Sequence, residues 1–62
     1  MMTITELRTT KGLTHSDMAK MLQVSKQTYT RWEAKPQNIS IFNAIRIAII
    51  FNVSIDEITF LP

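Results

Sequence analysis

Apolar residues recur at steps of three and four along almost the whole chain, a spacing typical of amphipathic helices. The pattern predicts five helices, near residues 3–11, 14–22, 25–33, 40–51 and 54–60. No segment alternates apolar and polar residues as a half-buried strand would. We therefore expect an all-α fold, a compact five-helix bundle that forms a single domain over residues 1–62. A longer protein that carries this chain as one of its parts is also consistent with the sequence.

Residues that start and stop helices stand at these boundaries. The capping-box pattern, a Ser or Thr followed three residues later by an acidic residue, occurs at Thr3 with Glu6, Ser54 with Glu57 and, in a weaker form, Thr14 with Asp17. Ser25 and Ser40 are good N-caps without the reciprocal acid. Gly12, the only glycine, follows the first helix at the usual left-handed position. Pro36 stands where the third helix should have ended.

Helical spacing also predicts the core. The positions that share inner faces or fill turns are Ile4, Leu7, Leu13, Met18, Ala19, Leu22, Val24, Tyr29, Trp32, Ile41, Ala44, Ile45, Ala48, Phe51, Val53, Ile55 and Ile58. Tyr29 and Trp32 are aromatic and could be read as base-stacking residues. Their spacing of three places them on the inner side of the third helix, so we expect them in the core.

Composition excludes several classes of function. The chain has 62 residues, a net charge of +2, no cysteine and one histidine, so neither a disulfide framework nor a thiolate metal site is predicted. No nucleophile with a neighbouring base and no glycine-rich phosphate loop is visible, so we expect no enzyme, cofactor, metal or small-molecule substrate. The longest apolar run, residues 47–51, is too short to span a membrane. The N-terminus does not have a signal peptide's pattern, which indicates a cytoplasmic protein.

The third helix has an outward face of a different kind. Lys26, Gln27, Thr28, Thr30 and Arg31 lie away from Tyr29 and Trp32. Glutamine can make paired hydrogen bonds to adenine, lysine or arginine can make them to guanine, and threonine can contact a thymine methyl group or a phosphate. Such a polar face can also be only a solvated surface, and the residue types alone leave both interpretations open.

One set of residues recurs at a characteristic spacing through most of the chain: Leu7, Arg8, Gly12, Leu13, Thr14, Met18, Ala19, Leu22, Val24, Ser25, Trp32, Glu33, Val53, Ser54, Ile55, Asp56, Glu57 and Ile58. This pattern over residues 7–58 resembles the Cro/lambda-repressor type of helix-turn-helix domain, the XRE family of small phage and bacterial regulators. It implies a lambda-repressor-like bundle with the helix-turn-helix at about residues 14–33. It also implies a sequence-specific transcriptional regulator that binds a double-stranded DNA operator, expected as a homodimer.

The resemblance also implies residue roles. Thr14 would cap the second helix and present its end to a phosphate. His15 stands where relatives often place a glutamine that touches the DNA backbone and buttresses a base-reading side chain. Lys26, Gln27 and Thr28 would read bases together with Arg31, and Lys35 would grip the backbone. The start of the third helix at Ser25 offers free N–H groups to phosphate as well. Arg8 and Glu33 would form a buried ion pair.

Two departures from the family pattern concern the turns. Gln23 stands where relatives usually have glycine between the second and third helices, which would strain a left-handed backbone by about 1 kcal/mol. The loop after the recognition helix begins with Ala34, Lys35 and Pro36 rather than an Asn-Gly-Lys type of sequence.

A partner surface is predicted on the fourth helix. Phe42, Ile49 and Ile50 stand where relatives commonly have polar residues, and Phe60 of the tail is expected near them. The alternative is that the small core recruits these residues. A partner surface also supports a second function, in which the chain is an antirepressor or modulator that forms a heterodimer with another repressor. An antitoxin role remains a further alternative.

Overall fold

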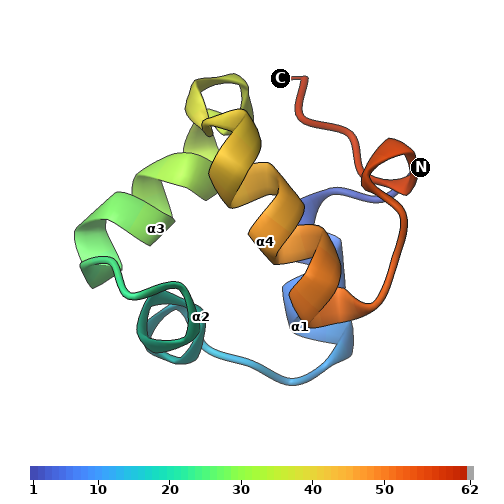
Figure 1. The fold of residues 1–62 in the computed structure, drawn as a ribbon. Helices are drawn as coiled ribbons and strands as arrows, with labels where there is room; N and C mark the ends of the chain where they lie inside the picture. Colours follow the sequence, from blue (N-terminus) through green and yellow to red (C-terminus); the bar gives the residue numbers. More distant parts are fainter. Residues whose placement is uncertain (62) are drawn as a thin grey trace.

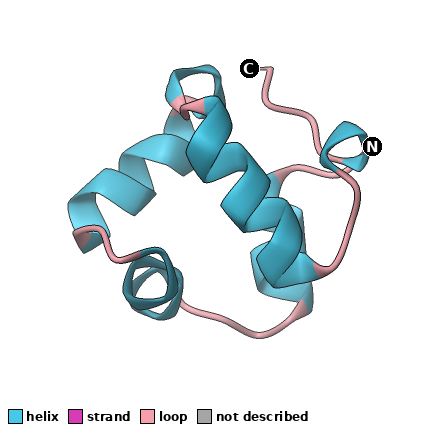
Figure 2. Ribbon diagram, in the orientation of Figure 1, coloured by secondary structure: helices cyan, strands magenta, loops and turns pink. Residues whose placement is uncertain are grey.

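The computed structural model describes residues 1–61, and within them four α-helices and two 3-10 turns account for all regular structure apart from one isolated bridge. The elements are α1 (Ile4–Thr10), α2 (His15–Leu22), α3 (Lys26–Ala34), η1 (Pro36–Asn38), α4 (Ile41–Phe51) and η2 (Ile55–Glu57). In Figure 1, α2 is seen nearly end-on, α3 lies beside it and α4 crosses the middle of the view. Figure 2 shows the same bundle as helices joined by short loops. The expected all-α class is confirmed.

Side chains cap the start of every α-helix. The Thr3–Glu6 and Thr14–Asp17 capping boxes both form, with the threonine hydroxyl accepting from the third helical N–H and the acid accepting from the threonine N–H. Ser25 and Ser40 accept from the N–H groups of Thr28 and Asn43. The predicted N-caps of the four α-helices are therefore confirmed, and Gly12 has the left-handed φ of 69° expected after α1.

One core joins the four helices. Its buried side chains are Ile4, Leu7, Met18, Ala19, Leu22, Tyr29, Ala44, Ile47, Ala48, Phe51 and Ile58. Trp32, predicted to lie inward, packs against this core and is only partly exposed. No helix of residues 1–61 has the length and apolar character needed to cross a membrane.

The predicted inner face of α4 is wrong in part. Ile41 and Ile45 were expected in the core, but they are 69% and 46% exposed, while Ile47 is completely buried. Because α4 is apolar on nearly every side, its spacing does not single out one face. Packing against α2 selects the side that carries Ala44, Ile47, Ala48 and Phe51.

The outward side of α4 differs from the predicted partner surface. Phe42 and Ile49 are 68% and 70% exposed, as that surface requires. Ile50 and Phe60 instead pack against the core and are only partly exposed, because the chain after α4 folds back over the bundle. The exposed apolar residues of α4 are thus Ile41, Phe42, Ile45 and Ile49, which we call the α4 stripe.

The predicted fifth helix, 54–60, is also wrong. Only the single turn η2 forms, and Ser54 makes no capping hydrogen bond because its hydroxyl contacts Asp56 instead. Beyond η2 the chain is extended and pairs with the N-terminus, where Met2 donates to the carbonyl of Glu57 and accepts from the N–H of Thr59, both at 2.9 Å. Tertiary pairing has overridden the local helix signal.

The turn between α2 and α3 holds the helix-turn-helix geometry. Gln23 ends α2 in the left-handed conformation with φ of 59°, and Val24 N–H donates to the carbonyl of Ala19 at 3.0 Å. Val24 packs against the core, so the turn is anchored from inside. The non-glycine residue therefore adopts the conformation that relatives assign to glycine.

Candidate nucleic-acid interface

The inner side of α3 is fixed by its aromatic residues. Tyr29 is completely buried and meets the ring of Trp32 edge-on, with 6.4 Å between the ring centroids. Burial raises the pKa of the Tyr29 phenol, and nearby Glu33 raises it further, so the side chain stays neutral. A helix held in this way must present its opposite side to solvent.

That opposite side carries the polar residues predicted from the sequence. Lys26, Gln27, Thr30 and Arg31 are exposed and, with Ala34, line an open hollow along α3. Lys35 is exposed immediately after the helix. No side-chain hydrogen bond or ion pair within residues 1–61 engages the cationic groups of Lys26, Arg31 or Lys35, so these charges are available to an anionic ligand.

Two of the predicted DNA-binding residues, Ser25 and Thr28, use their hydroxyl groups at the N-terminus of α3 instead. Ser25 accepts from the N–H of Thr28 at 3.1 Å and donates to the Thr28 hydroxyl at 2.9 Å. Thr28 is partly buried. Its side chain therefore reaches a ligand less freely than those of Lys26 and Gln27, and both residues primarily fix the position of the first turn of α3.

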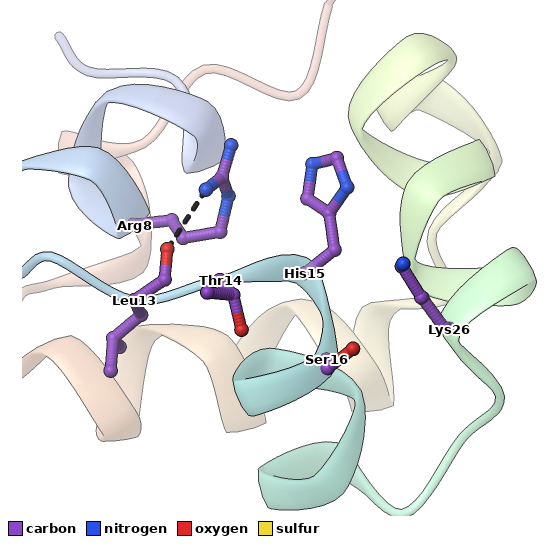
Figure 3. A pocket seen from close by; sticks show the side chains of 6 residues that line it. All are labelled: Arg8, Leu13, Thr14, His15, Ser16 and Lys26. Carbon is purple, nitrogen blue, oxygen red and sulfur yellow. Dashed lines mark hydrogen bonds between the residues drawn. The ribbon is translucent and has the colours of Figure 1, made fainter.

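A polar cleft separates the start of α2 from the start of α3 (Figure 3). Its lining residues are Arg8, Leu13, Thr14, His15, Ser16 and Lys26. Arg8 donates to the carbonyl of Leu13 at 2.9 Å, which holds the loop before α2 in place. The start of α2 borders this cleft, and the side chains of His15 and Lys26 are among those that line it. This arrangement is suited to an oxygen anion such as a phosphate.

His15 joins the two helices of the motif. Its Nε2 lies 3.2 Å from a carboxylate oxygen of Glu33, and its Nδ1 lies 3.4 Å from the hydroxyl of Thr30. A neutral imidazole that donates from Nε2 and accepts at Nδ1 satisfies both contacts. The ring also lies tilted against Tyr29, with 5.9 Å between centroids. His15 therefore contacts both Glu33 beneath the surface and Thr30 on the exposed face of α3.

Glu33 lies beneath this surface and accepts hydrogen bonds from several side chains. Its carboxylate accepts from Arg8 Nε at 2.6 Å, from Arg8 Nη2 at 3.2 Å and from the Thr5 hydroxyl at 2.9 Å. The two side chains of the ion pair are 14% and 10% exposed, so the pair is mostly buried. Burial alone would raise the pKa of Glu33, but the hydrogen bonds from Arg8 and Thr5 prevail and lower it to about 2. The pair ties α1 to α3 and stays ionised at neutral pH.

Two of these contacts escaped the sequence analysis. The hydrogen bond from Thr5 to Glu33 has a weak signal, since Thr5 and Arg8 are three apart on one face of α1. For the contact between His15 and Thr30, the resemblance implies only that residue 15 buttresses a base-reading side chain. That the partner is Thr30 depends on how α2 packs against α3. Among residues 1–61, no group of three or more histidine, cysteine, aspartate or glutamate side chains could hold a metal ion.

Comparison with known families agrees with this geometry. The sequence matches the model of the family described as Helix-turn-helix over residues 4–58. The chain therefore belongs to that family, and its recognised class is the Cro/lambda-repressor or XRE type. Searches of curated proteins and of solved structures give no match. This is a family of DNA-binding transcriptional regulators and not an enzyme family, so double-stranded DNA is the ligand class that membership implies.

Proposed function

We propose that the chain is a sequence-specific regulator of the phage repressor or Cro type, which reads an operator through α3. The observation that carries the proposal is the outward face of α3, where Lys26, Gln27 and Arg31 are exposed while Tyr29 anchors the other side. A major groove admits one α-helix, and amide and cationic side chains are those that pair with base edges. A cytoplasmic location goes with this function.

The residues divide into two roles. Gln27, Lys26 and Arg31 specify bases, with Thr30 held in register by His15. The DNA backbone is positioned by Thr14 and His15 at the start of α2 and by Lys35 after the end of α3. Contacts to phosphate fix the protein on the duplex and contacts to base edges select the sequence.

The chain acts as a homodimer on a two-fold symmetric operator. One recognition helix of nine residues reads too few base pairs for useful specificity alone. Two copies related by a two-fold axis double the contact area and place their helices in successive major grooves, about 34 Å apart.

Selection of duplexes from a random library, followed by binding titrations, tests the proposal. Gln27→Ala should reduce the preference at one position of each half-site by about tenfold to a hundredfold, while binding random DNA as before. Lys35→Ala should weaken selected and random DNA equally. Met21→Ala, an exposed change on α2, should alter neither. Equal losses on both DNAs for Gln27→Ala would refute base reading.

A second candidate function is favoured by the α4 stripe. Exposed apolar residues of this size suit a protein partner, and an antirepressor would use them to form a heterodimer with another repressor. Mixing the chain with the repressor of a neighbouring gene distinguishes the two functions. Tight heterodimer formation without affinity for DNA would support the antirepressor. DNA binding without heterodimer formation supports the operator-reading regulator.

A further inference from the structure

The α4 stripe places four large apolar side chains close together on the surface. Ile41, Phe42, Ile45 and Ile49 are between 46% and 70% exposed, and at 3.6 residues per turn they fall within an arc of about 100°. An apolar arc of that width is what a helix normally turns toward a core. Here it faces solvent over two turns. We propose that the α4 stripe is covered by the α4 stripe of a second copy of this chain.

The spacing of the isoleucines favours a second copy as the occupant. Ile41, Ile45 and Ile49 form one ridge with equal steps of four residues on either side of Ile45. A two-fold axis through Ile45 would place an antiparallel copy so that Ile45 meets Ile45 and Ile41 meets Ile49. Ridges with steps of four are the ones that interlock in the commonest class of helix packing. The stripe is therefore complementary to itself, as an isologous interface requires.

The charges support the same occupant. α4 has no acidic residue, and its only cation, Arg46, lies at the edge of the stripe. The guanidinium of Arg46 lies 5.7 Å from the Phe42 ring centroid and donates to the side chain of Asn43 at 3.2 Å. The charge is therefore kept at the rim, and two stripes can meet without burying an unpaired charge. A membrane-binding helix would instead carry several lysines or arginines along its polar side.

The available area predicts a weak interface. One side of a stable interface buries about 800 Å², whereas these four side chains offer on the order of 400 Å² of exposed apolar area. The chain has only 4047 Å² of surface in all, so the stripe is a substantial part of it. We therefore expect a dimer with a Kd between about 10 µM and about 1 mM. Two adjacent half-sites on DNA would strengthen it by raising the effective concentration.

Cysteine cross-linking tests the geometry directly, because the chain has no cysteine of its own. Under mild oxidation, Ile45→Cys should form a covalent dimer at least tenfold faster than Met21→Cys, whose native residue has a similar exposure of 44%. A mixture of Ile41→Cys and Ile49→Cys chains should yield mainly the mixed dimer. Equal rates for Met21→Cys and Ile45→Cys would overturn the proposed register. So would a mixture in which most dimers join two Ile41→Cys chains to each other.

Sedimentation velocity from about 10 µM to about 1 mM tests the association itself. The unmodified chain should sediment faster as its concentration rises, and Ile45→Lys should stay monomeric while Met21→Lys behaves as the unmodified chain. Circular dichroism checks that each variant is folded, and Ile49→Lys, at a site 70% exposed, replaces Ile45→Lys if that variant unfolds. An unmodified chain that stays monomeric, or stripe variants that still dimerise, would refute the proposal.

The inference extends the homodimer of the proposed function, but the two fail differently. Lack of DNA binding with intact cross-linking through Ile45→Cys would refute operator reading alone. Binding of two-half-site DNA that survives Ile45→Lys and Ile49→Lys would refute the α4 interface alone.

Discussion

The outward faces of α3 and α4 are opposites on the same small bundle. Both helices bury one side in a common core, with Tyr29 and Ile47 completely enclosed. The exposed side of α3 is polar, with amide and cationic groups. The exposed side of α4 is apolar, with the four residues of the α4 stripe. The polar face is well solvated and suits an anionic, hydrogen-bonding ligand, whereas burial of the apolar face lowers the free energy by removing it from water.

The difference indicates two kinds of recognition in one chain of 62 residues. In the proposed function, polar groups on α3 supply specificity, because hydrogen bonds to base edges depend on the DNA sequence. In the proposed dimer, apolar groups on α4 supply association, and only the spacing of the isoleucine ridge discriminates between partners. Substitutions that affect only one of the two faces therefore provide the strongest tests.

The largest expected effect is on stability, and it distinguishes the buried apolar side of α4 from the exposed one. Ile47→Ala should lower the free energy of unfolding by about 3 kcal/mol, because it empties a completely enclosed site. Ile49→Ala, the same change at a site 70% exposed, should cost less than about 0.5 kcal/mol. Urea unfolding at a low protein concentration measures both. Equal losses would mean that Ile49 is part of the folded monomer's core and that the stripe is not free.

The next effect concerns the ion pair between Arg8 and Glu33 that ties α1 to α3. The pKa of Glu33 in the folded chain is about 2, below the value of 4.5 for a free glutamate, so the unfolded chain binds the extra proton first. Stability from Glu33 is complete above pH 4.5 and is lost as the pH falls toward 2. We expect a loss on the order of 2 kcal/mol across that window, allowing for solvent screening.

Urea unfolding of Glu33→Gln across the same pH range isolates this contribution. The variant should be less stable at pH 7, because Arg8 is left without its carboxylate, and its stability should change less between pH 4.5 and 2. Glu57→Gln, at an exposed carboxylate on η2, is the matched control and should follow the unmodified chain. A steep pH dependence that persists in Glu33→Gln would show that other carboxylates account for it.

A smaller effect compares one cation that follows α3 with one on α4. Lys35→Ala should weaken DNA binding about tenfold, or roughly 1.4 kcal/mol, and reduce the slope of log affinity against log salt by about one, because Lys35 is proposed to contact phosphate. Arg46→Ala on α4 removes the same charge from the chain but should leave the slope unchanged, because Arg46 is held against Phe42. Binding titrations at several salt concentrations measure both slopes. Equal changes would mean that the net charge, and not the contact made by Lys35, governs binding.

The sequence-based predictions that the structure confirms rest on contacts between residues close together in the chain. The N-caps Thr3, Thr14, Ser25 and Ser40 were all predictable, because a capping hydrogen bond spans only three residues. The placement of Tyr29 in the core followed from its helical spacing alone. The same spacing predicted which side of α3 is exposed, although what that side binds is a proposal.

Contacts between distant segments account for what the sequence could not supply. The fifth helix was predicted from Ser54 and Glu57, but pairing of Met2 with residues beyond η2 holds that segment extended. The inner face of α4 was misassigned because nearly all its positions are apolar. The link between His15 and Thr30 requires knowing how two helices cross.

The smallest expected effect lies in the turns that lead into α3 and out of α4. Gln23 and Asn52 both have a left-handed backbone, with φ of 59° and 54°. Gln23→Gly should raise the free energy of unfolding by about 0.5–1 kcal/mol, since glycine adopts this conformation without the strain caused by a Cβ atom. Asn52→Gly should gain less, because asparagine tolerates the left-handed region better than glutamine does. Urea unfolding compares the two variants. A loss of stability for Gln23→Gly would mean that the greater freedom of glycine in the unfolded chain outweighs the relieved strain, and that the glutamine is not a defect of the turn.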